Sequence, residues 1–226
     1  MPSRNVLNSI QIKTIKLISK SELAKFYYWT GGTALTYKYL NNRRSEDLDF
    51  FSGNLLRDEN LLIELNKFKK DLNITKIKLT RELNRQRFVL GFSNGQDLKL
   101  EFVFFPFKSL SKPVLDKKLG IRIDSLVDMA TNKTLATFQR NEPKDIFDLY
   151  SLLINKKMRL SELIKKVDKK FGVKIDEADL EAKILDKVES LKEIKPLLLD
   201  KKDLDIDKIR DFFTKKSISY LKNFIF

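Results

Sequence analysis

The sequence predicts an α/β (α+β) first domain with a small mixed sheet flanked by helices, and a helical second domain, over residues 1–115 and 116–226. Short runs rich in aromatic and β-branched residues, which are typical of strands, occur between residues 26 and 105. From Ile123 onward, the apolar residues recur at helical spacing instead. Pro106 and Pro113 interrupt both patterns, and we expect the connection between the domains there.

The first domain opens with a helical pattern over Asn5–Ser19 and an aromatic strand at Phe26–Trp29. Gly31 and Gly32 end this strand and let the backbone approach a ligand closely. We expect the next helix, Thr33–Leu40, to direct its first N–H groups into this turn. Such a turn favours an anionic group such as phosphate.

A second strand contains Leu48, Phe50 and Phe51, and an aspartate lies on each side of Leu48. Because side chains alternate along a strand, we expect Asp47 and Asp49 on the same face. Two adjacent carboxylates repel each other unless a cation lies between them. Hard oxygen ligands beside a phosphate site favour Mg²⁺, with Mn²⁺ as an alternative. An exposed strand face beside a simple turn is the plainer interpretation, and the two motifs together favour the metal site.

The next segment predicts a helix and then three strands. The strands cover Ile74–Leu79, Arg87–Phe92 and Leu98–Phe105, and Asn94-Gly95 between the last two is a strong hairpin signal. The apolar face of the preceding helix comprises Leu55, Leu56, Leu61, Leu62, Leu65 and Phe68.

Glu101 lies on the last of these strands, where it could add a third carboxylate to the aspartate pair on a neighbouring strand. The structural alternative is an exposed glutamate that pairs with Lys99.

The second domain should begin with two long helices, Ser125–Arg140 and a helix that ends near Asn155. Asn141 is the expected N-cap of the second helix, close to Pro143. Pro196 is expected to end a later helix. The further candidate helices are Ser161–Phe171, Asp176–Ile194, Leu204–Phe213 and Ile218–Phe224.

Four charged residues of the two long helices form a second candidate group. Lys133 and Arg140 are seven positions apart, and Asp145 and Asp148 are three apart, so each pair lies on one helix face. A short connection makes the two helices antiparallel neighbours. From composition alone, the group would be an interhelical ion-pair cluster.

Composition excludes several kinds of chemistry. With no cysteine and no histidine, the chain has no disulfide, thiolate nucleophile, histidine base or histidine-bound zinc. The lack of cysteine fits a reducing cytoplasm, and no long apolar segment suggests a membrane span. The formal charge of +14 attracts polyanions, although a lysine-rich proteome would produce the same excess.

The glycine turn, the helix and the aspartate pair follow the order of the nucleotidyltransferase superfamily of the DNA polymerase β type. The segments GGTALTYKYL and RRSEDLDFF more closely resemble the AbiEii/AbiGii-type nucleotidyltransferase toxins. The resemblance covers roughly residues 28–153 in separate blocks. It implies a polymerase-β-like domain that a helical domain completes, with the active site in the cleft between them.

The resemblance also implies roles for the candidate residues. Asp47, Asp49 and Glu101 would be the catalytic metal ligands, although this family usually has aspartate at the third position. Lys133 would bind the triphosphate, and Asp145 would belong to an acidic motif that organises the active site. The remaining nucleotide-binding candidates are Gly31, Gly32, Thr33, Arg44, Arg140 and Asp148.

The implied reaction is transfer of a nucleoside monophosphate from an NTP, in a toxin–antitoxin or abortive-infection system with an antitoxin encoded nearby. The positive charge favours RNA as the acceptor, above all the 3′ end of tRNA, and we expect the basic stretch Lys156–Lys170 to hold it. Two alternatives remain open. The acceptor could be a protein hydroxyl, or the chain could be a non-catalytic module that binds nucleotide or RNA.

Overall fold

The computed structural model describes residues 6–54 and 57–225, with side chains as far as residue 215. The chain divides into two compact units after Leu126. The sequence placed this division at residue 115. The difference arises from two short strands that join the sheet of the first unit, β6 (Val114–Asp116) and β7 (Ile121–Ile123).

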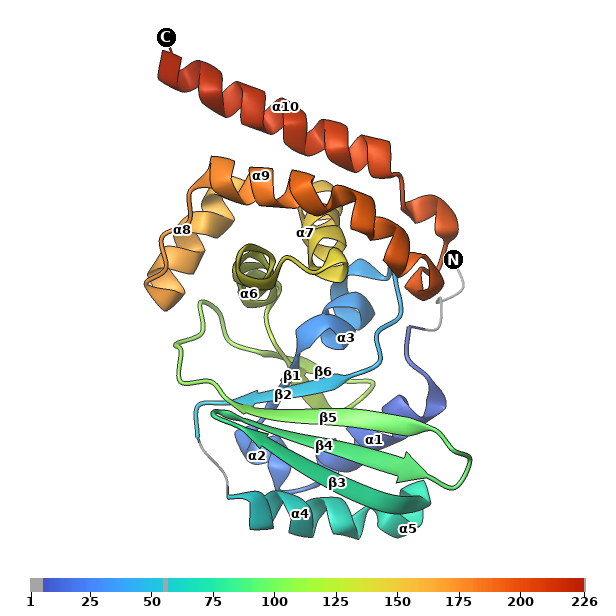
Figure 1. The fold of residues 1–226 in the computed structure, drawn as a ribbon. Coiled ribbons are helices and arrows are strands. Elements are labelled where there is room, and N and C mark those ends of the chain that lie inside the picture. Colours follow the sequence, from blue (N-terminus) through green and yellow to red (C-terminus); the bar gives the residue numbers. More distant parts are fainter. Residues whose placement is uncertain (1–5, 55–56, 226) are drawn as a thin grey trace. The chain divides into compact units, whose positions relative to one another are not determined.

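A seven-stranded mixed sheet forms the centre of the first unit, with the strand order β3-β4-β5-β2-β1-β7-β6 (Figure 1). Strand β2 runs parallel to β5, and β1 runs parallel to β7, whereas the other neighbours are antiparallel. The sheet therefore has the mixed character that the sequence predicts, including the β4–β5 hairpin. The remaining strands are β1 (Tyr28–Thr30), β2 (Leu48–Ser52), β3 (Ile74–Glu82), β4 (Arg85–Phe92) and β5 (Asp97–Phe104).

Short helices connect these strands. The predicted aromatic strand starts two residues late, because Phe26 still belongs to α2. Leu55 and Leu56, which the sequence assigns to the next helix, lie outside the described residues. The helices are α1 (Ser9–Lys20), α2 (Leu23–Phe26), α3 (Gly31–Leu35) with its π-helical continuation Thr36–Leu40, α4 (Asp58–Lys67) and α5 (Lys69–Leu72).

The two faces of the β3–β5 part of the sheet differ in burial. Phe102 lies at the centre of one face, with its ring 5.3 Å from that of Phe50 and 5.0 Å from that of Tyr27. Helices α4 and α5 lie along this apolar face (Figure 1). Because side chains alternate, Asp49 and Glu101 project from the opposite face.

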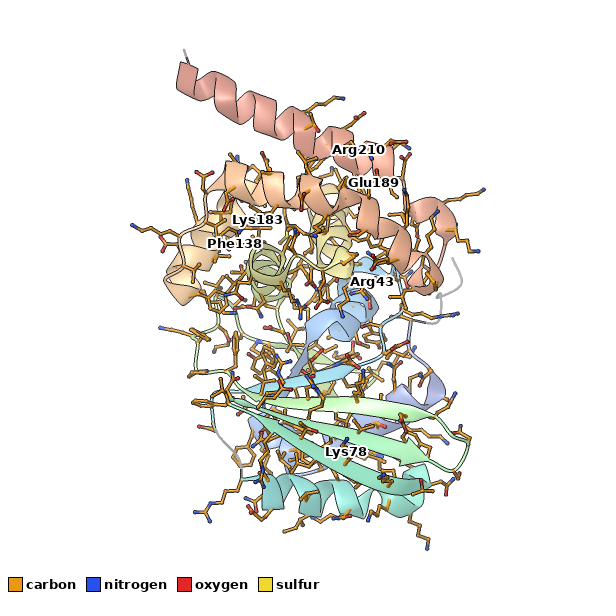
Figure 2. The ribbon with its side chains drawn as sticks, viewed as in Figure 1. Arg43, Lys78, Phe138, Lys183, Glu189 and Arg210 are labelled. Carbon is orange, nitrogen blue, oxygen red and sulfur yellow. The ribbon has the colours of Figure 1, made fainter. Side chains whose placement is uncertain are left out.

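The second unit is helical, as predicted. Helices α9 and α10 run side by side, and Arg210 of α10 pairs with Glu189 (Figures 1 and 2). Of the two helices predicted after residue 203, the structure makes one, α10. The elements are α6 (Leu126–Arg140), α7 (Pro143–Asn155), α8 (Leu160–Phe171), α9 (Glu177–Lys187), the 3₁₀ segments Val188–Leu197 and Lys201–Asp203, and α10 (Ile206–Ile225).

Two predicted helix boundaries in this unit are wrong. Asn141 is not the N-cap of α7: its φ of 51° is left-handed, its side-chain amide donates to the Lys183 carbonyl at 2.7 Å, and Glu142 caps the helix instead. Asparagine tolerates this backbone better than most residues, so it ends α6. Pro196 does not stop the preceding helix but lies within the 3₁₀ segment. Among the described residues, no helix is long and apolar enough to cross a bilayer.

Candidate functional site

The glycine turn and one of the aspartates are in direct contact. Strand β1 ends at Thr30, which pairs in register with Asp49 of β2. The next residue, Gly31, has a left-handed φ of 75°, and a Cβ there would lie 1.9 Å from the Asp49 Oδ2 atom. No other residue fits, because any side chain would displace this carboxylate. The glycine turn and the aspartate motif, which lie on consecutive strands, are thus adjacent in the structure.

The second aspartate precedes β2 and is held through the backbone around it. The Thr33 hydroxyl is buried and donates to the carbonyl of Asp47. The amide of Gln11 donates to the carbonyls of Ser45 and Glu46, at 2.9 and 3.1 Å. These bonds fix the loop that leads into Asp47. The Thr33 hydroxyl therefore supports the loop, and its contact with phosphate stays a prediction.

Sequence reasoning missed Gln11. This side chain is 1% exposed and also completes a capping box with Asn8 at the start of α1. The Asn-x-x-Gln spacing could have indicated the cap. Its contact with a loop more than thirty residues away has no local signal.

Of the two consecutive arginines, the one beside the glycine turn is Arg43. It is 1% exposed, and a Cβ on Gly32 would lie 3.1 Å from its Nη2 atom. Its Nη1 donates to the carbonyl of Arg44 at 3.0 Å, while Arg44 itself is exposed. Figure 2 labels Arg43. The sequence suggested Arg44 for nucleotide binding and could not distinguish the two. The structure brings Arg43 to the turn.

Glu101 is the register partner of Asp49 on the parallel strand β5, as the sequence suggested. Its two carboxylate oxygens, however, pair with Arg87 Nε and Arg85 Nη1, each at 2.8 Å. The hydrogen bond that Arg87 donates to Glu101 raises the pKa of Arg87 above its ordinary value, and burial offsets this only in part. Glu101 thus binds two arginines and differs from the exposed partner of Lys99, while its role as a metal ligand stays a prediction. Lys99 instead lies 3.9 Å from Asp47.

Asp47 and Asp49 fit a magnesium site without a third carboxylate. Among residues 6–54 and 57–215, no three acidic side chains gather into a metal-binding group. Mg²⁺ commonly uses one or two protein carboxylates and takes its other ligands from substrate phosphates and water. The contact between Asp49 and the glycine turn would place such phosphates next to the carboxylates.

In the second unit, the structure brings together all four residues of the other predicted group. Lys133 Nζ lies 2.7 Å from Asp145 Oδ1 and 3.0 Å from Asp148 Oδ2. Arg140 binds both oxygens of Asp145, at 2.6 and 3.0 Å. Both carboxylate side chains are fully buried, and the Lys133 side chain is 9% exposed. These contacts match the ion-pair alternative.

The charges of this cluster control the ionisation of Asp145. Burial raises the pKa of Asp145, but the attraction of Lys133 and the hydrogen bonds from Arg140 and Lys133 outweigh it. The net result is a pKa of about 2. Asp145 is therefore ionised at neutral pH.

A family comparison identifies the chain. Residues 16–215 match the model of the nucleotidyl transferase AbiEii toxin of type IV toxin–antitoxin systems. The chain belongs to the AbiEii family. Both candidate groups lie within the matched residues. The protein is accordingly a nucleotidyltransferase toxin, and its family implies an NTP substrate and an antitoxin partner.

Individual proteins are similar to this chain in sequence or in fold. An uncharacterized protein of Aquifex aeolicus (strain VF5) is 30% identical over 165 residues, which cover 73% of this chain and 76% of the relative. A Helicobacter pylori protein described as a "putative nucleotidyltransferase" has the same fold, with a TM-score of 0.57, 22% identity, and coverage of 95% of this chain and 99% of that one. JHP933 from Helicobacter pylori gives a TM-score of 0.55 at 20% identity, with 95% and 93% covered.

Proposed function

We propose that this AbiEii-family toxin transfers a nucleoside monophosphate from an NTP to a hydroxyl of RNA, most simply the 3′ end of a tRNA, and releases pyrophosphate. The contact between Gly31 and Asp49 carries the proposal, because it joins a phosphate-binding turn to a metal-binding carboxylate. Only glycine at position 31 leaves room for the Asp49 carboxylate beside the turn, where the pair could bind a phosphate and its metal ion.

In the proposed site, Asp47 and Asp49 hold Mg²⁺ or Mn²⁺, which would neutralise phosphate charge and align the α-phosphate for attack. Backbone N–H groups at Gly31 and Gly32 bind the β- and γ-phosphates. Arg43 supports the turn from its buried side and adds positive charge there.

The Lys133 group enters the proposal through the family motif. We propose that Lys133 contributes to triphosphate binding and that Asp145 and Asp148 orient its ammonium group. The Arg140 side chain is 49% exposed while it binds Asp145, so it can also bind an anion of the substrate. The exposed Arg44 is a further candidate for nucleotide binding.

The acceptor is inferred from charge. A formal charge of +14 favours a polyanion over a protein hydroxyl. To test this, the purified protein is incubated with Mg²⁺ or Mn²⁺, each α-labelled NTP in turn, and total cellular RNA. We expect label in RNA of tRNA size that ribonuclease removes and protease does not.

Asp49→Asn is the matched control, because it keeps the size of the side chain and removes its charge. This variant should remain folded and label nothing, since a metal ligand lost from the site costs orders of magnitude in rate. If the label survives ribonuclease and disappears with protease, the acceptor is a protein and not RNA. Near-normal labelling by Asp49→Asn would contradict the metal assignment.

A further inference from the structure

We propose that the open face of the sheet beside Asp49 binds the single-stranded end of the RNA acceptor. Its cations would hold phosphates, and its aromatic side chains would hold a base. The open face is the side of β2–β5 on which Asp49, Glu101 and Arg87 are neighbours in register. Helices α4 and α5 lie against the opposite side (Figure 1). This inference rests on the proposed function, because it locates the acceptor of that reaction.

Two arginines on β4 are fixed next to the aspartates. Glu101 binds Arg85 and Arg87 through separate oxygens, and its own side chain is only 10% exposed. The two arginine side chains remain 36% and 32% exposed. One buried carboxylate thus presents two partly exposed guanidinium groups, whose several N–H donors suit phosphate. Because Glu101 already orients these groups, they lose less entropy when an anion binds.

Lysines extend this positive surface along the sheet. The Lys99 side chain is 53% exposed and lies 3.9 Å from Asp47. Lys78 of β3 is exposed and shares a row with Lys99, because both pair in register with Val89 (Figure 2). On the β3–β5 part of the open face, cations outnumber acids by two, with Lys76, Lys78, Arg85, Arg87 and Lys99 against Glu82, Asp97 and Glu101.

An aromatic cluster lies on the other side of the aspartates. Phe51 follows Asp49 by two residues and so projects from the same face. Its ring lies 6.4 Å from Tyr28 and 4.7 Å from Phe105, which in turn lies 5.0 Å from Phe107. Phe107 is 42% exposed. Partly exposed rings beside cations are what single-stranded nucleic acid needs, since bases stack on aromatic side chains.

Arginines and aromatic rings together on this face favour single-stranded RNA over a duplex. Arg85 and Phe51 share one row of the sheet, because both are register partners of Val103. Phosphate and base sites therefore alternate over short distances beside Asp49. In a duplex, the bases stack on each other, so only an unpaired end can use the rings.

One lysine of the basic stretch Lys156–Lys170, which the sequence suggested for RNA, is buried. The Lys170 side chain is 1% exposed, and its ammonium lies 2.6 Å from Asp128 and 2.9 Å from Asn132. This lysine ties α8 to α6 and cannot serve as an RNA contact. Lys165 and Lys169 on α8 are exposed and supply a control.

The test measures binding of a fluorescent single-stranded oligoribonucleotide to the full chain by anisotropy, without NTP or metal. Phe107→Ala should weaken binding about tenfold, through the loss of one stacked base. Lys99→Gln should reduce the slope of log Kd against log salt by about 0.7, one phosphate contact on a single strand. Lys165→Gln keeps the same change of charge on α8 and should bind as the unmodified protein does. The same sequence as a duplex should bind more weakly.

The possible results distinguish a failure of this inference from a failure of the proposed function. If Phe107→Ala and Lys99→Gln bind normally while the protein labels RNA, the inference is wrong and the proposed function stands. If both variants lose binding but the unmodified protein never labels RNA, the face is an RNA site and the proposed reaction is wrong. If Phe107→Ala loses NTP binding and keeps RNA binding, the rings hold the nucleotide base and the inference fails.

Discussion

Replacing Gly31 by alanine tests the contact on which the site depends. The left-handed φ of 75° costs an alanine roughly 1–2 kcal/mol. The added Cβ would also lie 1.9 Å from Asp49 Oδ2, whereas such atoms hardly ever approach within 3.0 Å. The carboxylate must therefore move by about 1 Å, and a displacement of that size near reacting groups can cost about a hundredfold in rate. We expect a modest loss of stability and a loss of activity of at least that size.

Gly95→Ala separates the two effects. Gly95 has nearly the same backbone, with a φ of 78°, but nothing lies within 4 Å of an added Cβ. Both variants should unfold at similarly reduced denaturant concentrations, and only Gly31→Ala should lose nucleotidyl transfer, measured by release of labelled pyrophosphate at matched folded fractions. Equal activity of the two variants would refute the reasoning, because it would mean that the position of Asp49 does not control the reaction.

Three further predictions concern the supports of the two groups. Gln11→Glu should lower the rate of transfer by loosening the loop before Asp47, because a carboxylate cannot donate to the two carbonyls. If Gln11→Ala transfers as fast as the unmodified protein, these donors are irrelevant to the reaction. Lys133→Met should destabilise the protein by about 3–5 kcal/mol in a denaturant titration, since two buried carboxylates lose the Lys133 ammonium although Arg140 still pairs with Asp145; an unchanged midpoint would contradict the cluster. The low folded pKa of Asp145, about 2 against 3.8, should stabilise the protein by about 2 kcal/mol above pH 4 and cease to do so as the pH falls towards 2. Asp145→Asn should abolish this part of the pH dependence of stability. If the variant and the unmodified protein lose stability identically on acidification, Asp145 does not contribute to it.

Local sequence signals predicted much of the fold. The Asn94-Gly95 hairpin and α7, which ends at Asn155, agree with the structure, because turn chemistry and helical spacing act over a few residues. Local signals failed where distant contacts decide. Asn141 ends α6 and does not cap α7, and its amide bonds to a carbonyl 42 positions away.

The candidate residues show the same division. The sequence alone determined that two glycines and two aspartates lie on consecutive strand ends, and that Lys133, Arg140, Asp145 and Asp148 could meet on two helices. Residue types and spacing suffice for that, since each group lies within a short stretch.

Only the tertiary structure decided which charged side chains pair with each other. Strand register places Arg85 and Arg87 on Glu101, so both of its carboxylate oxygens pair with arginine. Burial makes Lys170 a structural residue although its neighbours in sequence are exposed lysines. The Glu101 pairs depend on the register of the β4–β5 hairpin, and the Lys170 contact joins two helices through residues 42 positions apart; neither composition nor periodicity encodes these contacts.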